Sequence, residues 1–261
     1  MAVSSGGTAP VPAPLDPRAR SALVTGAAGG IGRACAERLA AAGLHVHLAD
    51  VDAEGLAEAA AATGGRAHLV DLTDEAAAAA LPGEVDVLVN NAGVQYVAPV
   101  PEFPPAEFRR MHALMVHAPF LLARRVLPYM YGRGWGRIVN ISSVHGLRAS
   151  AYKSAYVSAK HALEGLSKVI AVEAAGRGVT SNCVSPGYVR TPLVERQIAE
   201  LARAHRISRE EVTEQVLLAR SPLGRLVDAA DVAETAAWLC GPHTAAVTGA
   251  SLTVDGGWTA T

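Results

Sequence analysis

Three polar residues in the middle of the chain have the types and the spacing to move a proton. Tyr156 and Lys160 are four residues apart, and Ser143 precedes the tyrosine by thirteen positions. Residues four apart on a helix share one face, with Cβ atoms about 5 to 6 Å from each other. A tyrosine normally titrates at about 10, and a neighbouring cation favours its phenolate form. The spacing therefore predicts that the Lys160 ammonium lowers the pKa of Tyr156, so that the tyrosine can act as a base beside a serine hydroxyl.

A glycine-rich segment near the start of the chain predicts a dinucleotide site. The letters TGAAGGIG occupy residues 25–32, directly after an apolar run and directly before an amphipathic one. Glycine is needed where φ is positive, or where a side chain would keep a pyrophosphate away from the N–H groups of a helix start. An ordinary structural turn is the alternative. A strand, glycines, a helix and a downstream acid occur together here, and this combination favours the nucleotide.

The downstream acid is Asp50, at the end of the run HVHLAD. A carboxylate at that place accepts hydrogen bonds from both hydroxyls of an adenosine ribose and repels a 2′-phosphate. A solvated loop aspartate is the alternative. Gly29 stands where an NADP-binding protein would place a cation, whereas the nearby Arg33 leaves NADP open. We expect NAD rather than NADP.

The elements that must position these residues alternate between short apolar runs and longer alanine-rich stretches. The runs have the length and composition of strands buried on both faces. Such alternation predicts an α/β fold, a single-domain Rossmann-type doubly wound parallel sheet with helices on both faces, over residues 19–261. Ligands of such sheets bind beyond the carboxyl ends of the strands. Residues 193–227 break the alternation and are predicted to form a helical lid over the substrate.

Composition excludes several other classes of protein. The 23 basic and 24 acidic residues form no basic stripe, which argues against nucleic acid as a partner. Three isolated cysteines predict neither disulfides nor a metal site. Residues 1–18 are rich in Pro, Ala, Ser and Gly and are predicted to be a disordered tail rather than a signal peptide. With no apolar run long enough to span a bilayer, we expect a soluble cytoplasmic protein that does not bind membranes.

Five separated motifs give the chain a family resemblance. They are TGAAGGIG, NNAG at 90–93, Ser143, the Tyr156 and Lys160 pair, and the Pro-Gly at 186–187 followed by Thr191. In this order and spacing they resemble the short-chain dehydrogenase/reductase family over residues 20–261. The resemblance implies a structural role for Asn90. It also implies cofactor contacts at Gly26, Gly30, Ile31, Gly32, Asp50, Asp71, Leu72, Asn91, Ala92, Tyr156, Lys160, Val189 and Thr191.

Within that family, longer runs resemble the D-3-hydroxybutyrate dehydrogenases. These runs include NNAGVQYVAPVPEFP, NISSVHGLRASAYKSAYVSAK, PGYVRTPLVERQI and DGGWTAT. The resemblance implies a pocket in which donors surround a substrate carboxylate and aromatic rings form the walls. Such a small anion must be recognised mainly through charge-assisted hydrogen bonds. The implied donors are Gln95, His145, Lys153 and Gln197, and the implied walls are Tyr188 and Trp258, with Tyr188 in place of an expected tryptophan.

The resemblance implies an NAD-dependent oxidoreductase that interconverts a small 3-hydroxy acid, 3-hydroxybutyrate above all, and its 3-keto acid. A ketoreductase for a larger β-keto substrate and a weakly active cofactor-binding regulator are the alternatives. It also implies a homotetramer formed through helices and the C-terminal segment.

One departure weakens the resemblance. Met115 replaces the asparagine that in this family anchors a water of the proton relay, and methionine cannot donate a hydrogen bond. His112 or His117 could substitute for it, or could be structural.

Overall fold

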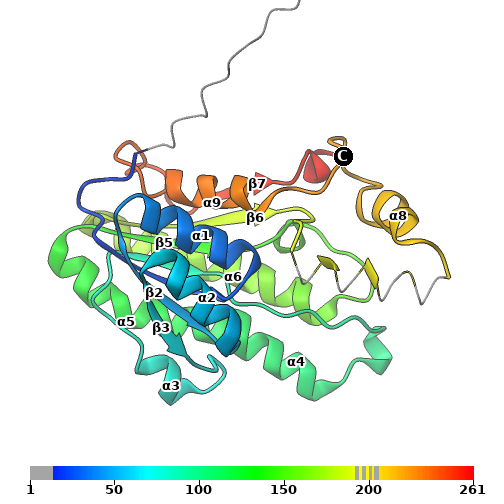
Figure 1. The fold of residues 1–261 in the computed structure, drawn as a ribbon, viewed down its shortest axis with the longest axis horizontal. Coiled ribbons are helices and arrows are strands. Elements are labelled where there is room, and N and C mark those ends of the chain that lie inside the picture. Colours follow the sequence, from blue (N-terminus) through cyan, green and yellow to red (C-terminus); the bar gives the residue numbers. More distant parts are fainter. Residues whose placement is uncertain (1–13, 192–193, 196–197, 200–201, 203–205) are drawn as a thin grey trace, which may run out of the picture.

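A computed structural model describes residues 14–191, 194–195, 198–199, 202 and 206–261. Its centre is a seven-stranded parallel sheet with the strand order β3-β2-β1-β4-β5-β6-β7 (Figure 1). The neighbouring strands β1 and β4 mark the point where the strand order reverses, which is where doubly wound sheets open a crevice for a ligand. The strands are β1 (Ser21–Thr25), β2 (His45–Asp50), β3 (Arg66–Leu69), β4 (Val87–Asn90), β5 (Gly136–Ile141), β6 (Val179–Pro186) and β7 (Ser251–Val254).

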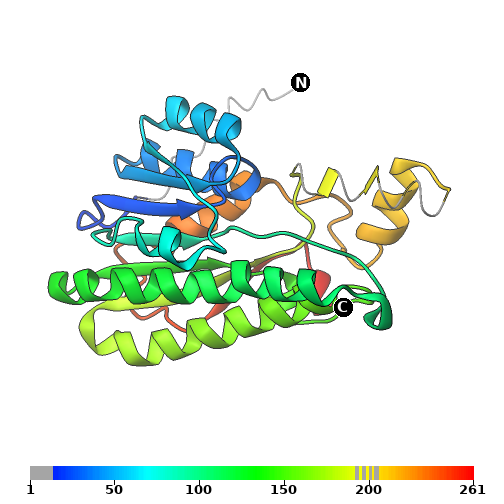
Figure 2. The ribbon, with the colours of Figure 1, turned by 90° about the horizontal axis from the view of Figure 1, so that it is seen from below.

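Helices cover both faces of the sheet (Figures 1 and 2). One face carries α1 (Gly30–Ala41), α2 (Ala53–Thr63) and α9 (Ala229–Trp238). The other face carries α3 (Glu75–Ala79), α5 (Ala118–Arg133) and α6 (Ser154–Ala174). A turn of π-helix, η2 (Ala113–His117), joins α4 (Pro105–His112) to α5, so that the three form one long helix.

Shorter elements connect these helices and strands. They are η1 (Val100–Glu102), η3 (Val144–Gly146), η4 (Ala175–Arg177), α8 (Arg209–Glu211), η5 (Val212–Leu217) and η6 (Trp258–Ala260). Among the described residues, no helix is long and apolar enough to cross a membrane.

Two apolar cores explain why the strands are hydrophobic without alternation. Successive side chains of a strand point to opposite faces. In β1, accordingly, Val24 packs into the core with α1 and α9, while Leu23 packs into the core with α5. Every residue of β5 and of β6 is buried, as expected for central strands covered on both faces. The predicted fold class is therefore confirmed.

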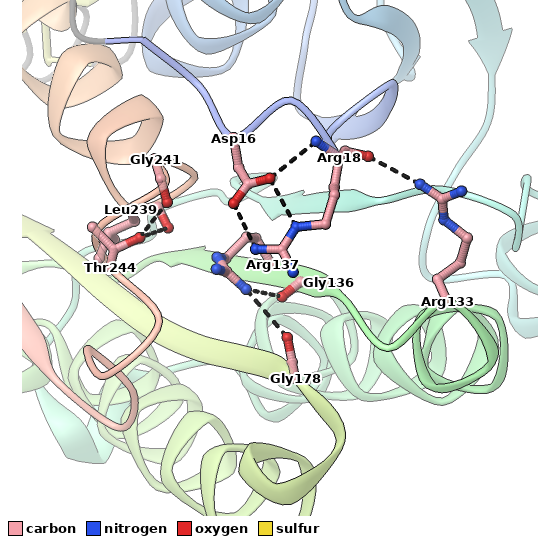
Figure 3. Close-up of polar contacts among 9 residues, drawn as sticks. All are labelled: Asp16, Arg18, Arg133, Gly136, Arg137, Gly178, Leu239, Gly241 and Thr244. Atoms are coloured by element: carbon pink, nitrogen blue, oxygen red, sulfur yellow. Dashed lines mark hydrogen bonds and ion pairs between the residues drawn. The ribbon is translucent and has the colours of Figure 1, made fainter.

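The segment that precedes β1 packs against the end of the sheet at which the strands begin (Figure 3). Asp16 is buried, its amide donates to the Cys240 carbonyl over 2.9 Å, and its carboxylate pairs with Arg18 over 2.8 Å. Arg137 of β5 is also buried. Its guanidinium lies 4.5 Å from the centre of the Trp135 ring and donates to neighbouring backbone carbonyls. Residues 14–18 thus pack against the domain, whereas the sequence places them in the tail.

The predicted lid, residues 193–227, is described only in part. Val194, Ile198, Val212 and Leu217 form a small apolar cluster, and Tyr188 packs against it. This cluster connects the segment to the carboxyl edge of the sheet, where the predicted site residues gather.

Candidate active site

A cavity of about 560 Å³ opens at the carboxyl edge of the sheet, between the glycine-rich loop and the ends of the central strands. Twelve of the thirteen residues that the resemblance assigns to the cofactor line it. Gly32 is the exception. The residues that line the cavity are Gly26, Gly30, Ile31, Asp50, Asp71, Leu72, Asn91, Ala92, Tyr156, Lys160, Val189 and Thr191.

Two glycines shape the loop for different reasons. Gly26 has a φ of +64°, and a Cβ there would lie 2.7 Å from the amide nitrogen of Asn91. A Cβ on Gly32 would collide with the Gly26 carbonyl oxygen. Gly32 is therefore required for packing, and its cofactor contact stays a prediction. Helix α1 begins at Gly30 without a side-chain cap, so its first N–H groups remain available to an anion.

Asp50 is fixed at the end of β2 by backbone donors. Its carboxylate accepts from the amide of Ala28 over 2.9 Å and from that of Val51 over 2.7 Å. The space around Gly29 is open, since a Cβ there would meet no atom within 4 Å. Arg33, the cation that left NADP open, is paired with Glu37 and Glu58 at 2.9 Å each. These surroundings favour a ribose hydroxyl over a phosphate beside Asp50.

The asparagine pair and Asp71 have structural partners. The Asn91 amide donates to the carbonyls of Thr25 and Gly26 over 3.0 and 3.1 Å, which ties the end of β4 to the glycine loop. Asn90 donates to Asn140 in the buried interior over 2.8 Å. Asp71 accepts from the backbone and side chain of Thr73, and these bonds lower its pKa.

The three predicted catalytic residues meet at the mouth of the cavity. Ser143 follows β5, while Tyr156 and Lys160 lie one turn apart on α6. The Lys160 Nζ atom lies 5.7 Å from the centre of the Tyr156 ring and donates to the Ile141 carbonyl over 2.7 Å. Ile141 is the last residue of β5, so the lysine joins the helix to the strand that presents the serine.

The electrostatics of this pair differ from the expectation. Burial raises the pKa of Tyr156, and the hydrogen bond with Ser143 opposes that rise. Burial also lowers the pKa of Lys160 to about 8. The prediction that Lys160 lowers the pKa of Tyr156 is not what this structure gives, because the ammonium is directed at the Ile141 carbonyl. The shared helix face is as predicted, but Ser143 is the group that stabilises the phenolate here.

Four of the predicted substrate residues, His145, Lys153, Tyr188 and Trp258, lie close together beside Tyr156. The His145 ring centre lies 6.0 Å from that of Tyr156, 6.3 Å from that of Tyr188 and 5.8 Å from that of Trp258. Lys153 Nζ donates to the Tyr188 hydroxyl over 3.1 Å.

The two predicted glutamines have different outcomes. The Gln95 amide nitrogen is buried and has no hydrogen-bond partner in the described part of the chain. Gln197 lies outside the described residues. A buried donor without a partner is costly, so Gln95 has a donor free for a ligand.

His145 has partners that the sequence did not indicate. Its Nε2 atom lies 2.9 Å from the Ser150 hydroxyl, and its Nδ1 atom lies 3.4 Å from that of Ser143. Burial, together with the charge of Lys153, lowers the pKa of His145 to about 3. The ring is therefore neutral at ordinary pH and positions Ser143. Ser150 gave no sequence signal, since small polar residues are common in loops.

Two arginines near the site were also missed. Arg110 lines the cavity, and its charge contributes to the low pKa of Asp71. The Arg220 guanidinium carbon lies 4.5 Å from the centre of the Trp258 ring. An arginine stacked on an aromatic face is stabilised by the ring quadrupole. Neither arginine belongs to a motif, so only the fold brings them to the site.

Met115 lies in the π-helical turn, fully buried, and Tyr156 packs against the apolar cluster that contains it. Neither candidate substitute reaches Lys160. His112 bonds the Phe108 carbonyl and the Ser158 hydroxyl, and His117 pairs with Glu75 over 3.1 Å. Both histidines therefore have structural partners, and the relay position carries an apolar side chain.

Comparisons with known proteins agree with this arrangement. The family model described as Enoyl-(Acyl carrier protein) reductase matches residues 26–259. The chain is 41% identical over 255 residues to the D-beta-hydroxybutyrate dehydrogenase of Rhizobium meliloti (strain 1021). The aligned region covers 92% of this chain and 99% of that protein. The chain is 39% identical over 253 residues to the D-beta-hydroxybutyrate dehydrogenase of Cupriavidus necator, which covers 92% and 98%.

A solved structure extends the likeness to the coordinates. A single-site variant of the actinorhodin polyketide ketoreductase, solved with NADPH, superposes with a TM-score of 0.87 at 34% identity, over 92% of this chain and 97% of that one. Sequence and fold thus lead to one conclusion. The chain belongs to the short-chain dehydrogenase/reductase family and is an oxidoreductase of the kind that binds a nicotinamide cofactor.

Proposed function

We propose that this protein is an NAD-dependent dehydrogenase that interconverts 3-hydroxybutyrate, or a close homologue, and its 3-keto acid. The observation that carries the proposal is the adjacency of two groups of side chains. The His145 ring lies beside Ser143 and Tyr156, the charge of Lys153 acts on His145, and Gln95 has a buried amide nitrogen without a partner among the described residues. We assign Lys153 and Gln95 to the substrate carboxylate and the hydroxyls of Ser143 and Tyr156 to the carbinol. A 3-hydroxy acid has a carboxylate and a carbinol separated by one carbon, so it can reach both groups at once.

The donors differ in what they offer the carboxylate. Lys153 is buried, and burial lowers its pKa to about 8, so it is largely an ammonium at neutral pH and can pair with an anion. The unpartnered amide of Gln95 adds a neutral donor. His145 contributes through Ser143 and Ser150, because both of its ring nitrogens are already engaged. Trp258 and Tyr188 enclose the remaining apolar carbons.

The proton is moved by Tyr156. In the oxidative direction its phenolate accepts the carbinol proton, while Ser143 donates to the same oxygen and positions it. In the reductive direction the neutral phenol donates the proton. Burial, which raises the pKa of Tyr156, favours that neutral form, and the Ser143 bond moderates the effect. Lys160 lines the cavity and is bonded to Ile141, and it would contact the cofactor ribose as well.

The cavity fits a dinucleotide. Its glycine loop leaves the N–H groups of α1 uncapped, and a side chain at Gly26 would collide with Asn91 and Ala92, which line the same cavity. When bound, the nicotinamide supplies the hydride acceptor. The Asp50 carboxylate, the open space at Gly29 and the paired Arg33 support NAD over NADP.

A second candidate is a ketoreductase for a larger β-keto substrate. The observation that favours it is the likeness to the polyketide ketoreductase, together with Tyr188 in place of the expected tryptophan, since a smaller ring alters the pocket volume. The two candidate functions can be distinguished by comparing activity on free acetoacetate with activity on an acetoacetyl thioester.

The test follows NADH absorbance with each substrate, in both directions. We expect a higher kcat/KM for the free acid, and a higher kcat/KM for the thioester would favour the ketoreductase. If neither substrate is turned over at high enzyme concentration, the result would favour the third candidate function, a weakly active cofactor-binding regulator.

A homotetramer is also part of this proposal. Val172 of α6 is 83% exposed, Val169 one turn earlier is 54% exposed, and Phe120 of α5 is 45% exposed. Contiguous apolar side chains on a surface mark sites of association. The resemblance implies that subunits meet through helices and the C-terminal segment, and we propose that α5 and α6 are among these helices.

A further inference from the structure

A buried carboxylate lies one helical turn beyond Lys160. Glu164 follows the lysine by four residues on α6 and is 5% exposed. Its Oε1 atom accepts from the Ser185 hydroxyl over 2.9 Å and from the Ser251 hydroxyl over 3.0 Å. These donors come from β6 and β7 and are neutral. They therefore fix the carboxylate in place without cancelling its charge.

The loop after Ser143 packs against α6 between the two residues. A Cβ added at Gly146 would lie 3.1 Å from the Glu164 Cγ atom and 3.2 Å from the Lys160 carbonyl oxygen. The backbone at Gly146 is thus in close contact with the helix between the two residues, and it is buried itself. Charges shielded from water act on each other more strongly than charges at a surface.

The groups that face Lys160 are few. Tyr156 and Glu164 face it from α6, Cys183 from β6, and the Ile141 carbonyl from β5. Burial lowers the pKa of Lys160, and electrostatic interactions with Cys183 and Glu164 oppose the change. Burial and Glu164 raise the pKa of the Cys183 thiol, so this group is uncharged at neutral pH. Glu164 is then the anion that acts on the lysine.

We propose that Glu164 is a positioning residue of the active site, a buried counter-charge that keeps the Lys160 side chain in its ammonium form one turn away. This inference rests on the proposed function, in which Lys160, held beside Tyr156, contacts the cofactor ribose. It explains how a fully enclosed lysine, whose direct hydrogen-bond partner is a neutral carbonyl, retains its proton.

The chain offers a direct test because it has three lysines, Lys153, Lys160 and Lys168. The side-chain nitrogens of lysine labelled with ¹⁵N can be followed by NMR as the pH changes, without any substrate. In Glu164→Gln, which keeps an oxygen acceptor for the two serines, we expect the Lys160 midpoint to fall by about one pH unit. The exposed Lys168 serves as the internal reference and is expected not to move.

The matched control is Ser185→Ala, which removes one hydrogen bond to Glu164 and leaves its charge. We expect a lower melting temperature in both variants but a shifted Lys160 titration only in Glu164→Gln. An unmoved Lys160 midpoint in folded Glu164→Gln overturns the inference. If Glu164→Gln does not fold, Glu164→Asp is the second variant, because its carboxylate lies one methylene farther from Lys160. We expect the Lys160 midpoint to fall in Glu164→Asp by less than one pH unit. An unchanged Lys160 midpoint in Glu164→Asp would also overturn the inference.

Turnover gives the second readout. In Glu164→Gln the alkaline decline of 3-hydroxybutyrate oxidation is expected at lower pH, because Lys160 loses its proton earlier; a decline at the parent's pH contradicts the inference. If the proposed function is wrong, the parent enzyme will not oxidise 3-hydroxybutyrate. The NMR titration of Lys160 uses no substrate, so it still tests the role of Glu164 in that case.

Discussion

The Lys153 side chain donates a 3.1 Å hydrogen bond to the Tyr188 hydroxyl, and its Nζ atom lies 5.1 Å from the centre of that ring. Burial raises the pKa of Tyr188 to about 12, so the hydroxyl remains neutral while it accepts from the lysine. A tryptophan at this position could not accept such a bond. The replacement of the expected tryptophan therefore gives Lys153 a partner that would compete with the carboxylate of the proposed substrate.

Removing this partner should strengthen substrate binding. In Tyr188→Phe, Lys153 no longer gives up a hydrogen bond when it pairs with the carboxylate. We expect KM for 3-hydroxybutyrate to fall about tenfold, with kcat little changed, as the removal of one competing hydrogen bond from a charged donor would give. Steady-state kinetics measure this, with Tyr188→Trp as the control for ring size. A higher KM in Tyr188→Phe would show that the hydroxyl bonds the substrate.

Removing the proposed base should stop the chemistry and leave cofactor binding intact. In Tyr156→Phe the ring remains, but no group can accept the carbinol proton, so we expect kcat to fall by about 10³-fold. NADH binding, followed by the quenching of protein fluorescence, should stay within about twofold of the parent. Oxidation of hydroxy acids at the parent's rate would mean that another group is the base.

Substrate affinity should weaken as the pH rises through the titration of Lys153. Burial lowers its pKa to about 8, so the ammonium that pairs with the carboxylate is present below that pH and is lost above it. We expect KM for 3-hydroxybutyrate to be flat at neutral pH and to rise on the alkaline side. Lys153→Gln should raise KM at neutral pH and remove most of the pH dependence. If KM for 3-hydroxybutyrate also rises at alkaline pH in Lys153→Gln, a group other than Lys153 is responsible for the pH dependence.

Cofactor preference should respond to the charge near Asp50. Gly29 has an extended φ of −164° and open space around it, so an arginine can be accepted there. In the double variant Gly29→Arg with Asp50→Asn, the cation attracts a 2′-phosphate and the repelling carboxylate is gone. We expect the ratio of kcat/KM for NADP to that for NAD to rise about 100-fold. Asp50→Asn alone separates the two contributions, and an unchanged ratio in the double variant would place the ribose elsewhere.

Assembly should depend on the apolar face of α6. Val172→Glu introduces a charge on the most exposed of its valines, which would be costly at a subunit interface and harmless at a free surface. We expect light scattering to report a smaller species than the parent, with an unchanged far-ultraviolet spectrum. Ala61→Glu, an exposed position on α2 at the other face of the sheet, is the matched control. A tetramer that persists in Val172→Glu would move the interface to other elements.

Much of the fold could be predicted because its signals are local. Runs such as HVHLAD and GRIVNISS are apolar on both faces, and this pattern requires burial from both sides, which a doubly wound parallel sheet provides. The glycine loop, Asp50 and the Tyr156 and Lys160 pair follow from chemistry that depends on residue type and spacing. The motifs end the strands and begin the helices that form the cavity, so their gathering at one edge followed from the topology.

The partners of these residues could not be predicted, because hydrogen bonds between distant segments depend on how the elements pack. The sequence spacing predicts that Lys160 lies beside Tyr156. The Lys160 ammonium, however, donates its hydrogen bond to the carbonyl of Ile141, which is nineteen residues earlier in the sequence. In the same way Ser150 reaches His145 within a loop of no regular pattern, and Ser251 reaches Glu164 across 87 residues. The sequence by itself determined which chemical groups are present and at which edge of the sheet they stand. The tertiary structure alone decided which of them touch, and hence their pKa values, because burial and close contact arise only when the layers pack together.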